Sequence, residues 1–259
     1  MPRADTGGYV PPTKAEQADF SKLVSLIISN QLADTIRLAE QNNYTLNYYV
    51  DRGDEEAMSY LLREKRPIEK GWGLYAIRLD SSSKIIVEAP HPLFDQRTPS
   101  VALDIYRALA ARALLIAGAH RNANGTGTAD AAHKTDTIFH SVHETLSRDI
   151  AATSGDVVVL QIHGYHTSKH DGYPQVVIGF GREIQPVESL LAQKLEAALT
   201  EQGISVGVCT GDIWLDLCAE KNVQAAAMEG GAFLHHEMYE ELRRHDDALI
   251  EALLQVFGR

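Results

Sequence analysis

The stretch that most constrains the fold is Val157 to His166, an uncharged run that ends in two histidines. Residues 157–162 read Val-Val-Val-Leu-Gln-Ile, and His163-Gly-Tyr-His166 follows. A short run of mostly aliphatic, β-branched residues is typical of a strand buried on both faces of a sheet. Open α/β sheets bind their ligands beyond the carboxyl ends of such strands. We therefore expect these histidines to lie at a ligand-binding edge.

Strand and helix patterns alternate from Ile85 onward, which favours βα units and a largely parallel sheet. The sequence predicts one α/β domain with a mostly parallel mixed central sheet and helices on both faces. Residues 1–14 are predicted to be a flexible arm, and residues 15–259 a single domain. Predicted strands are 73–79, 84–89, 113–118, 157–163, 176–179, 204–208 and 223–228; predicted helices are 15–41 with a break near Asn30, 55–64, 99–113, 137–148, 187–202 and 234–256. The first two strands are expected to form a hairpin through a turn at 80–83.

Composition narrows the classes of function. The chain has 259 residues, with 24 Lys and Arg against 35 Asp and Glu, for a formal charge of -11. An acidic protein repels phosphate backbones, so we expect no nucleic-acid partner. No run of about 18 apolar residues is present, so no membrane partner is expected. No signal peptide is visible, which leaves open both a cytoplasmic protein and a mature exported form.

Four predicted strands end in unusual polar chemistry. The segments are Pro90-His91-Pro-Leu-Phe-Asp95, His120-Arg121-Asn122, His163-Gly-Tyr-His166 and Met228-Glu229-Gly-Gly231. Because parallel strands share one carboxyl edge, these segments are expected to converge although they are remote in sequence. This convergence is the main evidence for a site.

Zinc prefers His nitrogen and carboxylate oxygen ligands, and catalytic sites keep one position for water. We expect His91, Asp95 and His163 to bind one Zn²⁺ per chain. Glu229 would accept the proton of the attacking water and pass it to the leaving amine. Arg121 would contact a substrate carboxylate or the developing oxyanion.

Structural roles for the same residues stay open at this point. A histidine at a strand end is often a surface or hydrogen-bonded residue, and Asp95 can cap the helix that follows it. Arg121 can pair with a surface acid. Glu229 is harder to explain structurally, because burying an unpaired carboxylate is expensive.

These segments together resemble the zinc carboxypeptidase-like superfamily, which includes succinylglutamate desuccinylase and aspartoacylase and, more distantly, N-formylglutamate amidohydrolases and poly-γ-glutamate hydrolases. The resemblance spans about residues 85–257 by the order of elements, and it implies His91 and an acid as the first ligand pair, His163 as the third ligand and Glu229 as the catalytic carboxylate. The family usually places two residues between the first His and a Glu. Here three residues precede Asp95, which leaves Glu88 as an alternative acidic ligand.

The remaining polar residues receive supporting roles. His120, Asn122, His133 and His166 are expected to contact substrate, and Asp130 to support the metal ligands or the substrate. His140 and His143, three residues apart on one helix face, are read as structural. Cys209 and Cys218 are compatible with a disulfide or with two buried thiols.

The sequence thus predicts a zinc-dependent metallopeptidase or amidohydrolase that cleaves a C–N amide bond of a small molecule or peptide. Two alternatives remain at this stage. One is a metal-dependent phosphoester hydrolase that uses the His-rich region 120–143, for which two metal ions are expected. The other is a non-catalytic binding protein on the same fold.

Overall fold

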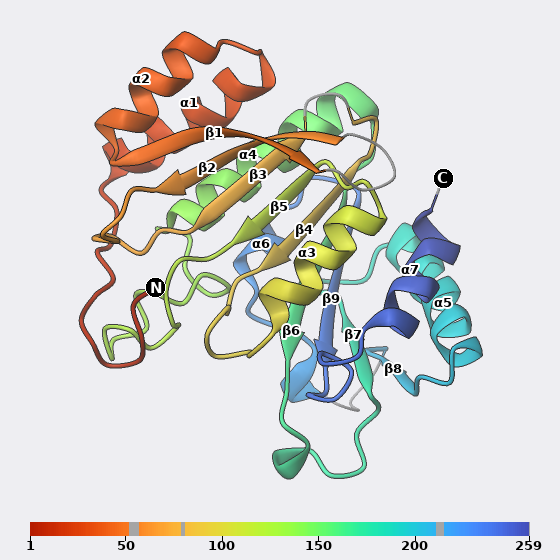
Figure 1. The fold of residues 1–259 in the computed structure, drawn as a ribbon. Coiled ribbons are helices and arrows are strands. Elements are labelled where there is room, and N and C mark those ends of the chain that lie inside the picture. The colour runs from red at the N-terminus through yellow and green to blue at the C-terminus, as the bar shows by residue number, and fades with distance from the viewer. Residues whose placement is uncertain (52–56, 79–80, 211–214, 259) are drawn as a thin grey trace.

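The computed structural model describes residues 1–51, 57–78, 81–210 and 215–258 (Figure 1). The strands are β1 (Tyr44–Asp51), β2 (Ala57–Glu64), β3 (Leu74–Arg78), β4 (Ile85–Ala89), β5 (Ala113–Ile116), β6 (Val158–Gly164), β7 (Val176–Gly179), β8 (Val206–Val208) and β9 (Ala232–Met238). The α-helices are α1 (Lys14–Ile28), α2 (Leu32–Gln41), α3 (Thr98–Ala108), α4 (Ile138–Ser154), α5 (Pro186–Glu201), α6 (Val223–Ala227) and α7 (Asp247–Phe257). Two 3₁₀ turns, η1 (Thr167–Lys169) and η2 (Leu215–Leu217), complete the described elements.

The nine described strands form one mixed sheet in the order β1-β2-β3-β5-β4-β6-β9-β7-β8. The four central strands, β5, β4, β6 and β9, run parallel, while β3 on one side and β7 on the other run antiparallel to their neighbours. The chain is therefore a single α/β domain with a mixed sheet, as the sequence predicts. The carboxyl ends of β4, β6 and β9 and the start of β7 meet at one edge.

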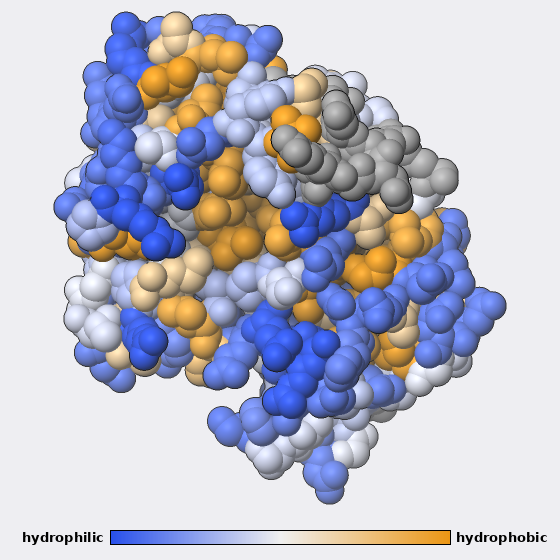
Figure 2. All heavy atoms as spheres, in the orientation of Figure 1, coloured by the Kyte–Doolittle hydropathy of each residue, from blue (hydrophilic) through white to orange (hydrophobic). Residues whose placement is uncertain are grey.

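Helices cover both faces of the sheet (Figure 1). On one face α1, α4 and α6 enclose a core that contains Phe20, Phe139 and Phe233. On the other face α3, α5 and α7 pack over Val87, Leu160 and other apolar residues. Strands β4, β5 and β6 are buried almost throughout, which explains their lack of charge apart from Glu88. A group of hydrophobic residues is visible on the surface around β2 and β3 (Figure 2).

Two expectations near the N-terminus have clear outcomes. The helix break expected near Asn30 is confirmed: α1 ends at Ile28, α2 starts at Leu32, and Asn30 has a φ of 54° between them. The expected helix over 55–64 is wrong in its described part, since residues 57–64 form β2. Pairing on both sides, with β1 and β3, overrides the helical propensity of this segment.

The expected hairpin of strands 73–79 and 84–89 is also wrong. Both strands exist, but β5 lies between them, antiparallel to β3 and parallel to β4. A crossover through α3 delivers β5 to that position, where its four residues are buried. Residues 79–80, which include the start of the expected turn, lie outside the described residues.

The C-terminal part contains two further corrections. Residues 223–227 form helix α6 and not a strand, because the Asn222 side chain caps the helix by accepting from two backbone N–H groups. The predicted helix over 234–256 is split into β9 (232–238) and α7 (247–257). Strand β9 pairs with β6 and β7 in the middle of the sheet, so its fully apolar start is core.

Candidate metal centre

Two histidines and one aspartate meet at the carboxyl edge of the sheet. His91 follows β4, His163 is the penultimate residue of β6, and Asp95 lies in the turn between β4 and α3. Asp95 Oδ2 is 3.1 Å from His163 Nδ1 and 3.4 Å from His91 Nδ1. The three side chains are buried, and one ligand atom from each lies within 4.8 Å of the others. The structure therefore brings together the three residues expected to bind a metal.

The Nε2 atoms of His91 and His163 each lie within hydrogen-bond distance of a buried acceptor. His91 Nε2 is 2.8 Å from Asp130 Oδ1, and His163 Nε2 is 2.8 Å from Gln161 Oε1. Asp95 is an acceptor that faces both Nδ1 atoms as well, so a neutral ring, which carries one N–H, can donate to only one of its two acceptors. A cation between the Nδ1 atoms and Asp95 removes this conflict, because Nδ1 then presents its lone pair to the cation while Nε2–H donates to Asp130 or Gln161. The three residues therefore fit a metal.

The electrostatics agree with this geometry. Burial lowers the pKa of His163 to about 4, so this imidazole is neutral at pH 7. Burial opposes ionisation of Asp95, but hydrogen bonds from His163 and His91 outweigh it and hold the pKa of Asp95 below its usual range. For His91, burial lowers the pKa, while hydrogen bonds to Asp130 and Asp95 raise it more, so the net shift is upward.

Asp95 has no role as a helix cap. Helix α3 begins at Thr98 with Arg97 at the N-cap position, and no side chain at that position caps it. The Asp95 carboxylate points instead toward the two histidines. Glu88, the alternative acidic ligand, is directed away from this cluster and bonds His143 and Gln161.

A second group of polar residues supports His91 from outside. Arg121 Nη2 is 2.5 Å from Asp130 Oδ2 and 3.2 Å from His133 Nδ1. Asp130 Oδ1 is also 3.0 Å from His133 Nδ1, and His91, Asp130 and His133 form a second cluster of possible metal ligands. Arg121 additionally lies over the ring of the exposed Phe94, 5.2 Å from its centroid.

Glu237, which the sequence analysis did not select, lies beside His163. The two residues are register partners on the parallel strands β6 and β9, and Glu237 forms a third possible ligand cluster with His163 and His235. Burial, followed by the negative charge of Asp95, raises the pKa of Glu237 well above its usual range. Its Oε2 is buried and has no hydrogen-bond partner among the described residues.

Arg243 also reaches this edge. Its guanidinium occupies the space where a side chain at Gly164 would stand: a Cβ there would lie 1.1 Å from Nη1. Arg243 is 7% exposed, and its Nε and Nη1 atoms have no partner among the described residues. Burial lowers the pKa of Arg243, while the carboxylates of Asp95, Glu237 and Glu240 oppose that shift.

Glu229 is not brought to the cluster. It follows α6 at the amino end of β9, whereas Glu237 stands near the carboxyl end of the same strand. Its side chain is exposed and lines a cavity of about 220 Å³ with Glu144, Arg148 and Val157. The placement expected for Glu229 was wrong because the apolar run before it is a helix, so the strand starts after the two glycines and not before them.

The four residues expected to contact substrate lie at the rim of the site, by which we mean the partly exposed residues around the cluster of His91, Asp95 and His163. His120 is half-buried against the ring of Phe94, with 5.5 Å between centroids, and its Nδ1 accepts a hydrogen bond from the Asn122 N–H. Asn122 is exposed, and the His133 side chain is 37% exposed. His166 is exposed in the loop after β6, 3.4 Å from Glu240.

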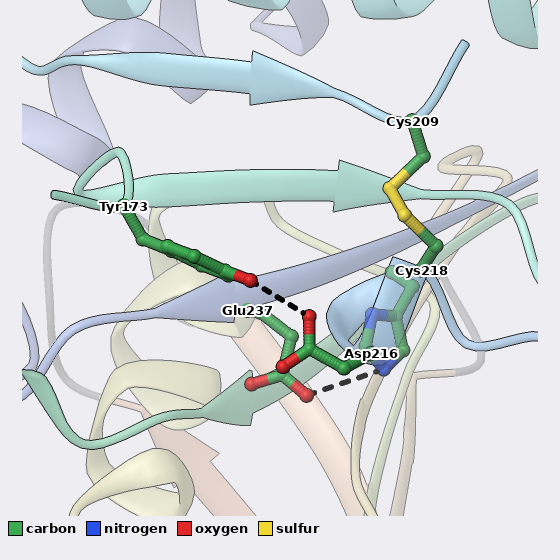
Figure 3. The surroundings of a disulfide bond; sticks show 6 residues. Tyr173, Cys209, Asp216, Cys218 and Glu237 are labelled. Carbon is green, nitrogen blue, oxygen red and sulfur yellow. Dashed lines mark hydrogen bonds and ion pairs between the residues drawn. A yellow bond between two sulfur atoms is a disulfide. The ribbon is translucent and has the colours of Figure 1, made fainter. Parts of the chain in front are cut away.

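A disulfide cross-links two segments near another part of the rim. Cys209 and Cys218 are bonded, which decides a question that the sequence left open. Figure 3 shows the disulfide with Asp216, Tyr173 and Glu237 nearby. The Tyr173 hydroxyl donates to Asp216 Oδ1 at 3.1 Å, and the Asp216 charge contributes to the raised pKa of Glu237. The segment just before Cys218 therefore carries a carboxylate to the neighbourhood of the site.

Comparison with known proteins gives no match by sequence, either to a family model or to a curated protein. The fold is similar to that of N-formylglutamate amidohydrolase from Ralstonia eutropha JMP134, with a TM-score of 0.50, 13% identity, and coverage of 73% of this chain and 98% of that chain. The chain has a zinc carboxypeptidase-like fold. This likeness confirms, for the fold, the resemblance stated from the sequence.

Weaker likenesses extend to two other solved structures. A metallo-carboxypeptidase from Burkholderia cenocepacia matches with a TM-score of 0.41 and 11% identity, over 96% of this chain and 69% of that chain. An aspartoacylase family protein from Mesorhizobium loti MAFF303099 matches with a TM-score of 0.40 and 12% identity, over 83% of this chain and 67% of that chain. Within the described residues of this chain, three groups of His, Asp and Glu side chains have ligand atoms close enough together to hold a metal ion, and the group of His91, Asp95 and His163 is buried throughout.

Proposed function

We propose that this chain is a zinc-dependent hydrolase that cleaves a C–N amide bond of a peptide or an acyl amino acid. The observation that carries the proposal is the convergence of His91 Nδ1, His163 Nδ1 and an Asp95 oxygen, each His ring being anchored through Nε2. Two imidazoles and one carboxylate are the ligand set of catalytic zinc sites that leave one position open. We assign one Zn²⁺ per chain to these residues.

Asp130 and Gln161 orient the two imidazoles. Each accepts the Nε2 proton of one ring, and such partners hold ring orientation and raise the basicity of the ligand nitrogen. A zinc ion bound here supplies a Lewis acid that polarises a carbonyl and lowers the pKa of water at the site to about 7.

Glu237 takes the role that the sequence assigned to Glu229. It stands beside His163 on the neighbouring strand, and its Oε2 has no partner among the described residues. The positive charge of a metal at the neighbouring site would favour the ionised form of Glu237, which burial opposes in the metal-free chain. The ionised oxygen would then accept a proton from the attacking water while the water oxygen bonds to the substrate carbonyl carbon. The same carboxyl group then donates the proton to the amide nitrogen as the C–N bond breaks.

Two arginines can bind negatively charged groups of the substrate. Arg243 has two N–H-bearing atoms, Nε and Nη1, without a described acceptor and lies near Glu237, so it can donate to the oxyanion that forms at the carbonyl. Arg121 is already paired with Asp130, so its exposed side and the ring of Phe94 form the outer contact for substrate. His120, Asn122, His133 and His166 are proposed to complete this rim.

A two-metal phosphoester hydrolase fits the residues less well. The first and second clusters share one ring, that of His91, through its two nitrogens. The second cluster also holds the Arg121 guanidinium against Asp130 and His133, and this positive charge repels a second cation. We therefore assign one metal.

Metal analysis combined with a substrate panel tests the proposal. The full-length chain is stripped with a chelator, reloaded with zinc and assayed on N-formyl, N-acetyl and N-succinyl amino acids and on short peptides. We expect one zinc per chain and hydrolysis that is lost on stripping and restored by zinc. A chain that binds no zinc, or that hydrolyses p-nitrophenyl phosphate but no amide, would overturn the assignment. Bound zinc without turnover on any substrate would favour a binding protein.

A further inference from the structure

A buried layer of hydrogen bonds behind His163 suggests how that ring is held in the form that binds metal. Glu88 on β4 and Gln161 on β6 are register partners in the centre of the sheet, and both are 0% exposed. Gln161 bridges to Asn222, the residue that caps helix α6. His143 on α4 bonds the other oxygen of Glu88 at 2.7 Å, which gives this histidine a defined partner.

The backbone fixes the direction of the hydrogen bonds around Gln161. Asn222 Oδ1 accepts from the N–H groups of Gln224 and Ala225, both at 3.0 Å. Backbone N–H groups only donate, so the Asn222 side-chain nitrogen must point the other way, toward Gln161 at 2.5 Å. The Gln161 atom facing it is therefore its oxygen, and the Gln161 nitrogen faces Glu88 at 2.9 Å.

A second backbone group requires the same orientation. The side-chain nitrogen of Gln224 donates to the carbonyl of Ala131 at 2.9 Å, so Gln224 Oε1 is the atom turned to Gln161. It lies 3.4 Å from Gln161 Nε2, the nitrogen already placed there by Asn222 and Glu88. Two independent anchors thus leave Gln161 one orientation, with its oxygen toward His163.

The consequence reaches the metal centre. His163 Nε2 lies 2.8 Å from Gln161 Oε1 and Nδ1 lies 3.1 Å from Asp95 Oδ2, so the neutral ring can donate to only one of these acceptors. A cation between Nδ1 and Asp95 requires the lone pair on Nδ1 and the proton on Nε2, and the Gln161 oxygen is already placed to accept that proton. We propose that Asn222 and Glu88 are positioning residues that act through Gln161 to fix the Nε2–H tautomer of His163, while they contact neither metal nor substrate. This proposal rests on the proposed function only in taking His163 as a zinc ligand.

The sharpest perturbation reverses the donor at Asn222. In Asn222→Asp the cap oxygen is kept, but a carboxylate oxygen replaces the donor that faces Gln161. Gln161 then meets acceptors on both sides, Asp at 222 and Glu88. If its amide turns, its nitrogen faces His163, and the ring must move its proton to Nδ1, where it blocks the metal. Loss of such supporting contacts typically weakens metal binding about 10–100-fold.

A double variant separates positioning from stability. In Glu88→Gln with Asn222→Asp, the whole layer can reverse: Gln161 donates to the new aspartate and accepts from the new glutamine. The side chains at positions 88 and 222 then both have a matching partner on Gln161, while the longer 3.4 Å contact to Gln224 Oε1 loses its donor. We therefore expect the double variant to unfold at a higher temperature than Asn222→Asp. Its zinc affinity stays low, because His163 still faces a donor. Glu88→Gln alone keeps the original direction and has a small effect on zinc affinity.

The measurements are zinc affinity by chelator competition on the full-length chain and the His163 tautomer from ¹⁵N shifts of the imidazole before zinc is added. Asn42→Asp is the matched control, because Asn42 is also 3% exposed and lies far away beside α2. We expect Asn42→Asp to lower thermal stability and leave zinc affinity unchanged. In the zinc-free chain Asp95 competes for the same proton, so we expect a larger share of the Nε2–H tautomer in the natural chain than in both Asn222 variants, in which Nδ1–H predominates.

Three outcomes would overturn the proposal: equal zinc affinity in the natural chain and Asn222→Asp, equal losses in Asn222→Asp and Asn42→Asp, or recovery of affinity together with stability in the double variant. If Asn222→Asp does not fold, the double variant carries the comparison. If the natural chain binds no zinc, the proposed function fails, but the tautomer of His163 in the natural chain and the double variant still decides this proposal.

Discussion

Replacing Glu237 by glutamine removes the proposed base without changing the size of the side chain. Its Oε2 has no partner among the described residues, and its Oε1 lies 3.8 Å from His235 Nε2, beyond hydrogen-bond range. The substitution therefore breaks no described hydrogen bond of this carboxyl group. A positioned general base contributes about 10²–10⁴-fold to rate. A factor of ten in rate corresponds to about 1.36 kcal/mol, so the activation free energy derived from kcat/KM should rise by roughly 2.7–5.4 kcal/mol.

The assay compares Glu237→Gln with Glu229→Gln on whichever amide the panel identifies, at equal zinc content. We expect Glu237→Gln to keep its zinc and lose turnover, and Glu229→Gln, an exposed glutamate on the same segment, to match the natural chain. Turnover in Glu237→Gln within threefold of the natural chain would refute the assignment of the base. So would a large loss in Glu229→Gln.

Stability gives a second readout of the same variant in the chain without metal. Burial raises the pKa of Glu237, so folding favours its protonated form. A raised carboxyl pKa means that the contribution of Glu237 to stability is complete below its unfolded pKa and falls as pH rises through its folded pKa. Glutamine does not titrate, so Glu237→Gln should gain stability relative to the natural chain as pH rises. Urea unfolding across pH 5–9 measures this difference.

Three further predictions concern the surroundings of the site. For Asp130→Asn, zinc affinity should fall about 10–100-fold by chelator competition. Burial opposes ionisation of Asp130, but hydrogen bonds from two histidines and the charge of an arginine hold its pKa below its usual range. The natural metal-free chain should therefore be more stable than Asp130→Asn near pH 7 and should lose this advantage as pH falls below about 4. Acid unfolding of the two chains would measure the difference. Gly164→Ala should displace Arg243, destabilise the chain by about 1–3 kcal/mol and lower kcat with zinc retained; Arg243→Ala should make the added methyl group harmless in the double variant. Replacing Cys209 and Cys218 by serine should lower the free energy of unfolding by roughly 2–3 kcal/mol for a loop of this length, with zinc affinity unchanged.

The sequence predicts the part of the site that follows long, unambiguous strands. Residues 157–162 are uncharged and mostly aliphatic, so the strand and the place of His163 follow directly. His91 is marked by a strand that ends at Pro90. Convergence of the two histidines needs only the rule that parallel strands share a carboxyl edge, and β4 and β6 are indeed parallel neighbours.

The errors come from short apolar segments, where periodicity cannot distinguish a helix from a strand. Residues 223–228 read as a strand, but the Asn222 cap starts a helix there, and this shifted the expected catalytic strand to the wrong side of the two glycines. The run Ala232-Phe-Leu-His-His-Glu237 carries the same signal as the strand before His163, with apolar residues followed by polar ones, and here two glycines precede it. That pattern is the one clue in the sequence to Glu237.

Other features depend on tertiary contacts that no local pattern encodes. Arg243 reaches the site because its guanidinium takes the space beside Gly164, 79 positions earlier in the chain. Strand β5 separates β3 from β4 through pairing decided by the whole sheet. The hydrogen-bond layer of Glu88, Gln161 and Asn222 likewise joins residues from three elements.

Anomalous scattering from a crystal of the zinc-loaded chain tests the central claim most directly, because it locates the metal independently of activity. We expect one zinc peak per chain, about 2.0–2.2 Å from His91 Nδ1, His163 Nδ1 and an oxygen of Asp95, with Glu237 adjacent and Glu229 remote. A peak held by His91, Asp130 and His133, two peaks per chain, or no peak at the carboxyl edge of β4 and β6 would contradict the account.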